Sequence, residues 1–293
     1  MRERIMAICY DFDKTLAPDD MQSFTFIPSV GMTIDEFWEE SDKLASENGM
    51  DKNLAWMKLM LDKAKENGRS IKRSAFMELG KNVPLYPGVV EWFKLINGYA
   101  ADRGIRTEHY IISSGLKEII AGSEIAPHIH RIYASTFYYY TDNTALWPAQ
   151  AVNYTNKTQY IFRIAKGAFE ENDERVNASY QDDQLYLPYE NMVYIGDSDT
   201  DIPCMRLVKS KGGTSIGVHD PKKHKEEKIH RLFREGRINY FAPADYREGK
   251  TLHRIMKKVI DLVAAREDLW QEEAALREVA DSPREEMKQS SNK

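Results

Sequence analysis

The chain contains 293 residues, of which 42% are hydrophobic and 30% are charged, and its formal net charge is −5. This balance, with a mean hydropathy of −0.58, is typical of a globular protein and excludes a fibre or a wholly disordered chain. The negative charge argues against a general nucleic-acid binder, which usually carries a basic excess. Because the chain is too long for one small core, we expect a larger domain and a second unit.

Cysteine usage and hydropathy exclude further classes. The two cysteines, Cys9 and Cys204, have no paired spacing, so neither a disulfide scaffold nor a zinc site is expected. His128 and His130 lie two apart without further ligand spacing, which also argues against zinc. No stretch approaches the roughly 20 apolar residues of a membrane helix, and residues 1–5 precede no signal-like apolar segment. We therefore expect a cytoplasmic protein without a membrane partner.

Short apolar runs alternate with longer helical patterns along the chain. This alternation predicts an α/β fold with a doubly wound, mostly parallel, Rossmann-like sheet. Three runs end directly in polar residues, at Asp11, at Ser113 and at Gly196 with Asp197. Ligands of open parallel sheets bind at the carboxyl ends of the strands, so these residues should meet in one crevice. The runs are Ile5–Tyr10, His109–Ile112, Met192–Ile195, Thr214–Val218 and Tyr240–Ala242.

Nearly a hundred residues separate the first two runs, far more than one crossover needs. Residues 87–103 begin with a proline, precede a glycine and carry apolar residues at helical spacing, so they predict the crossover helix. Residues 18–85 then form an inserted helical cap, while residues 1–17 and 86–265 form the core. The helices expected in the cap are Thr33–Asn48, with Thr33 and Glu36 in capping-box spacing, Leu54–Glu66 and Ile71–Gly80.

The second half of the chain has weaker patterns. Aromatic and β-branched residues predict a β-hairpin over 131–152. Packing within the hairpin is expected for Tyr138, Tyr139, Tyr140 and Trp147, in preference to stacking on a base or sugar. A helix capped by Thr155 or Asn156 should run to about Phe169. We expect an acidic surface loop at 170–190. The basic residues from Lys222 to Arg237 are expected to form a solvated helix face in preference to a patch that steers the substrate. A final core helix is expected at Thr251–Ala265, and the charged tail at 266–293 should extend this helix before fraying.

Two carboxylates follow the first apolar run in the sequence Asp11-Phe12-Asp13-Lys14-Thr15-Leu16. Carboxylates two residues apart beside a buried strand repel each other unless a cation or protons offset their charge. An isolated pair of this kind is more often a strand-end turn or a helix cap. Here the continuation, DFDKTL, resembles the first motif of the haloacid dehalogenase-like superfamily, DxDx(T/V)(L/V).

The other motifs of this superfamily follow in the same order. Ser113-Ser114-Gly115 after the second run resembles motif two, and Lys157 at a helix start resembles the lysine of motif three. Gly196-Asp197-Ser198-Asp199-Thr200-Asp201 resembles the acidic metal-binding motif four. Each element alone has a plain structural interpretation as a cap or solvated residue. Together, the four motifs occur in the family's order over residues 5–260, and this resemblance implies a phosphohydrolase of phosphoserine-phosphatase-like type with an inserted cap.

The resemblance implies a role for each motif residue. Asp11 would be the nucleophile that becomes phosphorylated, and Asp13 the acid and base that serves the leaving group and then water. Lys157, Ser113 and the amides of Ser114 and Gly115 would hold the phosphoryl group. Thr15 would organise the turn after the nucleophile. Mg²⁺ would be bound by Asp11, the backbone carbonyl of Asp13, Asp197 and Asp201, the last directly or through water.

Several alternatives stay open or are set aside. The Asp13-Lys14-Thr15 triplet also resembles the phosphorylation motif of ion-pumping ATPases, with Asp13 as nucleophile, but the following residues differ and membrane helices are lacking. Haloalkanoic dehalogenases lack the second acid. Asp199 is expected to be a turn or cap residue.

A small phosphorylated metabolite is therefore the expected partner, with hydrolysis favoured over phosphotransfer or non-enzymatic binding. The cap should close over it, hinged near residues 17–18 and 85–87. Oligomeric state stays open.

Overall fold

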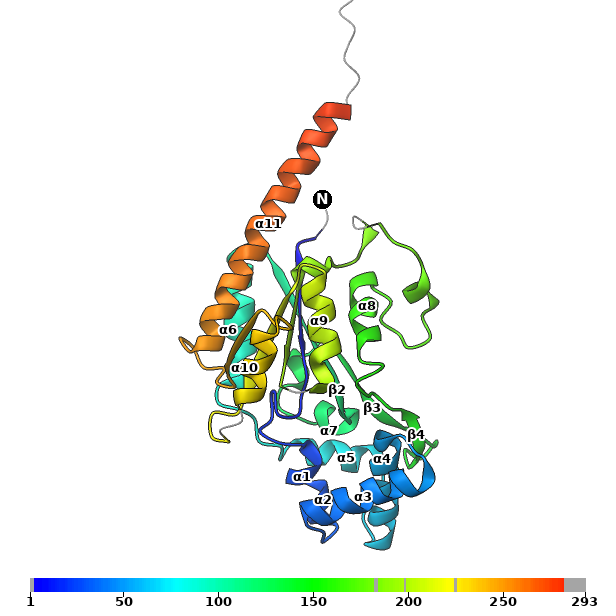
Figure 1. Cartoon of the computed structure of the whole chain (residues 1–293). Coiled ribbons are helices and arrows are strands. Elements are labelled where there is room, and N and C mark those ends of the chain that lie inside the picture. Colours follow the sequence, from blue (N-terminus) through cyan, green and yellow to red (C-terminus); the bar gives the residue numbers. More distant parts are fainter. Residues whose placement is uncertain (1–2, 182–183, 198, 224–225, 282–293) are drawn as a thin grey trace, which may run out of the picture.

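The computed structural model describes residues 3–181, 184–197, 199–223 and 226–281. Within these ranges the chain is an α/β protein with one seven-stranded sheet of order β4-β3-β2-β1-β5-β6-β7 (Figure 1). Ser198, His224, Lys225 and the tail beyond Asp281, which figured in the sequence interpretation, lie outside the described residues. The strands are β1 (Ile5–Tyr10), β2 (Arg106–Leu116), β3 (Arg131–Tyr139), β4 (Ala145–Gln150), β5 (Met192–Gly196), β6 (Thr214–His219) and β7 (Tyr240–Pro243).

The sheet is parallel except for the β3–β4 hairpin, as the predicted fold class requires. β1 lies in the centre, and Cys9 stands opposite Tyr110 of β2 on one side and Tyr194 of β5 on the other. This register brings the carboxyl ends of β1, β2 and β5 to one edge of the sheet. β2 is longer than predicted, because it extends through Leu116 with a register shift after Ser113.

Helices cover both faces of the sheet, and β1 shows why. Its alternate residues Met6, Ile8 and Tyr10 join one apolar cluster, which includes residues of α6 (Val89–Ala101) and α11 (Thr251–Asp281). Ile5, Ala7 and Cys9 join the other cluster, with α8 (Thr158–Lys166) and α9 (Ile202–Ser210). Side chains of a strand point alternately to opposite faces, so an uninterrupted apolar strand needs a helical layer on each side.

Residues 18–85, called the insert below, carry five helices at one end of the molecule (Figure 1). The predicted capping box is present: Glu36 N donates to Thr33 Oγ1 (3.2 Å) and Thr33 N donates to Glu36 Oε2 (2.8 Å). The side chain of Asp51 accepts from Asn53 N at 2.8 Å and starts α4 two residues earlier than predicted. The helices are α1 (Met21–Phe24), α2 (Phe26–Ser29), α3 (Ile34–Asn48), α4 (Lys52–Glu66) and α5 (Arg73–Gly80).

The last helix of the insert is fixed to the core. α5 crosses α7 (Lys117–Ala121) so closely that a Cβ on Gly80 would lie 2.0 Å from Ile119 O. A Cβ on Gly122 would lie 1.8 Å from Met77 O. Because only glycines allow such an approach, α5 and α7 form a tight pair. The hinges expected near residues 17–18 and 85–87 remain predictions, and movement of the whole insert would have to separate α5 from α7.

Two predictions for residues 131–169 were wrong in detail. Tyr138 lies on β3, Tyr140 lies in the turn that follows, and Trp147 lies on β4. Their side chains are 53%, 57% and 68% exposed, so they do not pack in the hairpin. Neither Thr155 nor Asn156 caps the following helix. The side chain of Asn153 accepts from both of their backbone amides, at 2.9 and 3.3 Å, and closes the turn that places Lys157 before α8.

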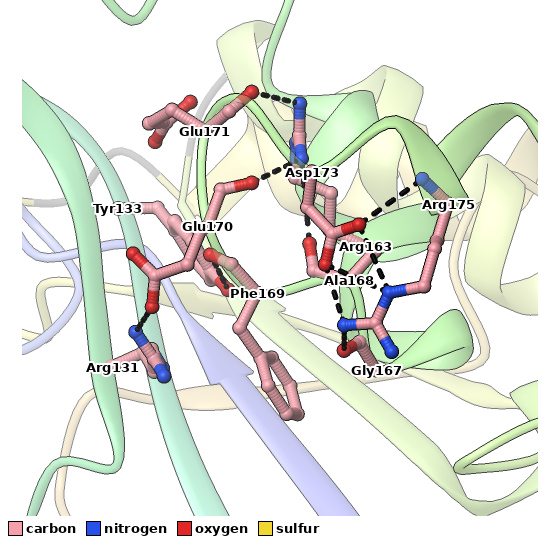
Figure 2. A network of polar contacts seen from close by, with 10 residues as sticks. All are labelled: Arg131, Tyr133, Arg163, Gly167, Ala168, Phe169, Glu170, Glu171, Asp173 and Arg175. Atoms are coloured by element: carbon pink, nitrogen blue, oxygen red, sulfur yellow. Dashed lines mark hydrogen bonds and ion pairs between the residues drawn. The ribbon is translucent and has the colours of Figure 1, made fainter.

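The segment 170–190 is more than the expected acidic surface loop. The buried guanidinium of Arg163 donates to the carbonyls of Ala168 (3.3 Å), Glu170 (2.6 Å) and Glu171 (2.7 Å), and Figure 2 shows how it gathers the start of the loop. Leu187 is also fully buried in the cluster beside α8. Glu170, Glu171 and Glu174 are exposed, but the backbone at the start of the segment is held by Arg163 of the core.

Two C-terminal helices pack on the core. α10 (Glu226–Arg234) buries Ile229 and Leu232 and exposes its charged side, so the basic run after Lys222 is a solvated face in the part described. α11 does not end at the predicted Ala265 but continues to Asp281. Glu267 and Asp268 attach it to Asn191 and Arg4, and the helix then projects from the body (Figure 1). In the described ranges no helix has the length and apolarity needed to cross a membrane.

Candidate active site

Three carboxylates meet at the carboxyl edge of the sheet. Asp11 follows β1, Asp197 follows β5, and Asp201 ends the short 3-10 turn Asp199–Asp201 before α9. The backbone of Asp11 continues the sheet, because its amide donates to Ile195 O at 3.0 Å. Each of the three residues offers a carboxylate oxygen within 4.8 Å of the others. The sheet register therefore brings together groups that are 190 residues apart in the chain.

A buried lysine joins two of these acids. Lys157 is fully buried, and its Nζ lies 3.2 Å from Asp11 Oδ1 and 2.8 Å from Asp201 Oδ1. Burial by itself would lower the pKa of Lys157, but the charges of Asp11 and Asp201 outweigh it and raise that pKa. Tyr194 OH also donates to Asp201 Oδ1, at 2.8 Å. The lysine is thus a permanent positive charge beside the carboxylate of Asp11.

One cation does not balance the acids. Burial, and after it the charge of Asp201, raises the pKa of Asp11 to about 7. Burial and then the charges of Asp201 and Asp11 raise the pKa of Asp197 well above its usual range. These shifts mean that the folded site favours an added positive charge. A cluster of carboxylate oxygens with excess negative charge is the donor set that suits a hard divalent cation such as Mg²⁺.

The chain turns sharply directly after Asp11. Phe12 O accepts hydrogen bonds from Leu16 N (2.9 Å) and Ala17 N (3.0 Å), and Lys14 adopts a left-handed conformation with φ of +59°. Residues other than glycine adopt this region uncommonly. The hydroxyl of Thr15 is buried without a partner in the described part of the chain. The expectation that Thr15 organises the turn was therefore wrong for its side chain, since backbone bonds hold the turn.

Asp13 faces the insert rather than the three-carboxylate cluster. Its Oδ1 accepts from Met21 N at 2.8 Å, which links the core to the start of α1. Burial, followed by the charges of Asp20 and Asp11, raises the pKa of Asp13 well above its usual range. A carboxyl group with a raised pKa can hold a proton near neutral pH and donate it. This placement suits an acid, and it agrees with a metal contact at position 13 through the backbone only.

Residues 113–115 lie at the end of β2, where the strand bulges. Ser113 is fully buried and its Oγ accepts from Gly115 N at 3.0 Å. A Cβ on Gly115 would lie 2.9 Å from Asp13 Oδ2 and 2.1 Å from Met21 Cε, so a larger residue there would displace these two side chains. Bulges often reorient groups beside a site. Ser114 and Gly115 border the same cavity as Asp13, and Ser113 is not among the residues that line it.

That cavity, of about 230 Å³, separates the motif residues from the insert. We call it the insert cavity. Its walls come from the first turn of the core, the end of β2 and helices α1, α3 and α4. The residues that line it are Asp13, Asp20, Gln22, Trp38, Ser41, Asp42, Lys52, Asn53, Trp56, Ser114 and Gly115.

Some residues of the site could not be found from motifs. Tyr194 of β5 donates a hydrogen bond to Asp201, but the sequence indicated only that it belongs to an apolar strand. Gly196 is required because a Cβ there would lie 2.6 Å from Asp201 Oδ2. Of the expected site residues, Asp11, Lys157, Asp197 and Asp201 lie together. Asp13, Ser114 and Gly115 line the adjoining cavity, and Ser113 is buried at the end of β2 outside that lining.

The chain is similar to known proteins in sequence and in structure. A curated protein from Borreliella burgdorferi, described as uncharacterized, is 29% identical over 287 residues and covers 88% of this chain and 98% of its own. A crystal structure of a probable phosphoserine phosphatase from Vibrio cholerae matches with a TM-score of 0.55 at 13% identity, over 90% of this chain and 67% of that one. A HAD family hydrolase from Salmonella enterica serovar Typhi matches with a TM-score of 0.51 at 19% identity, over 76% and 65%.

These structural likenesses establish the fold, because the identities are low. The sequence itself goes further: residues 8–206, about two thirds of the chain, match the family model of haloacid dehalogenase-like hydrolases. That range begins within β1 and ends within α9, so it contains the three acids, the buried lysine and the bulge described above. The chain therefore belongs to the haloacid dehalogenase-like hydrolase family.

Proposed function

We propose that this hydrolase cleaves small phosphomonoesters, in a reaction that depends on Mg²⁺ and passes through phosphorylated Asp11. The observation that carries the proposal is the arrangement of charge around Asp11. Lys157 lies 3.2 Å from its carboxylate, and a protonatable Asp13 lines the insert cavity. A nucleophile, a fixed cation and an acid at one strand end are the groups that phosphoryl transfer through a carboxylate needs.

In the first step an oxygen of Asp11 bonds to phosphorus while the ester P–O bond breaks. Asp13 gives its proton to the departing oxygen, so the alcohol leaves neutral. In the second step Asp13, now a carboxylate, takes a proton from a water molecule that attacks phosphorus and releases phosphate. Lys157 keeps Asp11 oriented and offsets charge on the phosphoryl oxygens.

A divalent cation fits the acidic cluster. Asp11, Asp197, Asp201 and the backbone carbonyl of Asp13 would hold it, since the raised pKa values of Asp11 and Asp197 favour added positive charge. When bound, Mg²⁺ would screen the repulsion between the nucleophile and the phosphoryl group. Neutralising this repulsion is what a dianionic substrate requires of the site.

The test compares phosphate release from an aryl and an alkyl phosphomonoester with Mg²⁺, with excess EDTA, and with Asp11→Asn. We expect release only from the unsubstituted chain with Mg²⁺. Metal-independent release, or equal rates in Asp11→Asn, would overturn the proposal. Adding an alcohol acceptor and analysing the products distinguishes hydrolysis from phosphotransfer, and no release with intact binding would indicate a non-enzymatic binder.

A further inference from the structure

The second half of α11 projects from the body of the molecule, at the end away from the insert (Figure 1). The first half packs on the core through residues such as Leu252, Met256 and Val263. From Gln271 to Asp281, in contrast, every residue is exposed. Helices in proteins draw most of their stability from packing an apolar face, and a short helix surrounded by water is marginal. The projecting half therefore favours a partner that packs against it.

This half carries apolar side chains at a regular spacing. Leu262, Leu269 and Leu276 follow one another at intervals of seven residues and are 52%, 69% and 68% exposed. Ala265 and Val279 each lie three residues after one of these leucines, and both are exposed. Apolar residues at alternating intervals of three and four form the contact stripe of a coiled coil. We call these five residues the leucine seam.

The leucine seam faces away from the core. Ile260 is fully buried and Glu267 accepts a hydrogen bond from Asn191, so these two residues mark the core side of α11. Leu262 and Leu269 each follow one of them by two residues, which turns their side chains roughly 200° around the helix. The same helix thus has one apolar face for the core and a second for another helix.

The charges of α11 are divided between its two halves. Residues 251–260 contain three lysines and arginines and no acid, whereas residues 267–281 contain six acids and one arginine. Arg254 and Lys258 are exposed, and they precede Leu262 by eight and four residues, which places them in line with the seam. Glu272 and Glu273 are exposed between the last two leucines. One end of the seam is therefore basic and the other acidic.

An antiparallel pair of α11 helices matches both features. When Leu262 lies opposite Leu269 of a second copy, the same register brings Lys258 beside Glu273 of that copy. The two-fold axis then repeats each contact, so the surface is complementary to itself. A parallel pair would instead bring the two acidic ends together, and like charges across an interface are unfavourable.

We propose that this chain forms a homodimer in which the projecting halves of α11 pair antiparallel and bury the leucine seam. A second copy is the partner because it supplies a matching apolar stripe and the opposite charge at each end. The inference is independent of the proposed phosphatase function. The carboxylates of the candidate active site lie at the edge of the sheet near the insert, so pairing at the other end leaves them accessible (Figure 1).

Sedimentation equilibrium of the full chain tests the pairing. We expect a concentration-dependent mass that approaches twice the 33.9 kDa of one chain. Leu269→Glu together with Leu276→Glu should raise the dissociation constant by about tenfold or more, because the pair would bury unpaired charges. The melting temperature extrapolated to low concentration should not change, since both side chains are exposed in the single chain. Leu146→Glu on β4, where the leucine is 47% exposed, is the matched control.

A monomer at high micromolar concentration, or a dimer that the two glutamates leave intact, overturns the proposal. The first result would mean that the seam is free or serves another partner, and the second that the chain pairs through another surface.

The orientation has two tests of its own. Lys258→Glu should weaken the dimer at low salt, and the added change Glu273→Lys should restore it, because the swapped charges face each other again. Spin labels attached through Glu278→Cys should lie roughly 35 Å apart in an antiparallel pair and within about 20 Å in a parallel one. The native cysteines are buried and should stay unlabelled. A short distance, or no recovery in the charge-swapped variant, overturns the antiparallel arrangement.

Discussion

Replacing Asp11 by asparagine should remove activity and yet make the metal-free protein more stable. The carboxylate of Asp11 is buried beside Asp201, and its pKa rises from 3.8 to about 7 on folding. At pH 8 a shift of that size corresponds to roughly 4 kcal/mol of lost stability, because the folded chain must ionise a group it prefers to keep neutral. Asparagine has nearly the same shape and carries no charge.

The attraction of Lys157 for Asp11 is already contained in this pKa, because it lowers the value that burial and Asp201 would otherwise produce. The substitution leaves Asp201 at 2.8 Å from the ammonium group of Lys157, the closer of its two carboxylates. We therefore expect the free energy of unfolding to increase by up to about 4 kcal/mol at pH 8 in the absence of divalent metal. Added Mg²⁺ should stabilise the unsubstituted chain more than the variant and reduce the gap.

The sign of the pH dependence follows from the raised pKa. The penalty on Asp11 is absent below the unfolded pKa near 3.8, grows with pH, and is complete above about 7. Urea unfolding in EDTA at pH 8 and at pH 5 should thus show a larger advantage for Asp11→Asn at pH 8. Asp102→Asn on the surface is the matched control. A variant that is less stable than the parent at pH 8, or an advantage equal at both pH values, would refute the electrostatic reasoning.

Three further outcomes are expected. Asp13→Asn should slow alkyl phosphates by about 100- to 10,000-fold and aryl phosphates much less, since an aryl leaving group needs little help from an acid; equal losses would exclude the role. Lys157→Met should lower the free energy of unfolding by about 3–5 kcal/mol at pH 8, measured in urea, because it leaves buried carboxylates without their cation; a neutral effect would contradict the ion-pair account. Gly122→Ala should lower the melting temperature by several degrees, as its Cβ would lie 1.8 Å from Met77 O, whereas Gly98→Ala, where a Cβ meets nothing within 4 Å, should not.

The sheet and the motif residues were predictable because their signals are local. The run Ile5–Tyr10 is apolar at every position, which is typical of a central strand buried on both faces. The polar residues at the strand ends then converge through sheet geometry alone. The same reasoning identified the capping box at Thr33 and Glu36, where the two side chains act within one turn.

What the sequence did not predict depends on contacts between distant segments. Nothing local distinguishes Tyr194 from an ordinary strand residue. Its contact with Asp201 follows from the packing of α9 on β5. The exposure of Trp147 is similar, since aromatic composition predicts a strand but not whether its outer face is covered. Element boundaries shifted where a single side chain such as Asn153 decides the cap.

The central claim is that Asp11, and not Asp13, carries the phosphoryl group. The most direct test is to react the Mg²⁺-loaded protein with a phosphomonoester, quench it in acid, reduce the acyl phosphate with borohydride and locate the modified residue by peptide mass spectrometry. The account predicts modification at Asp11, and none in Asp11→Asn. Modification at Asp13, as in the pump-like alternative, or rapid turnover without any modified aspartate would contradict it.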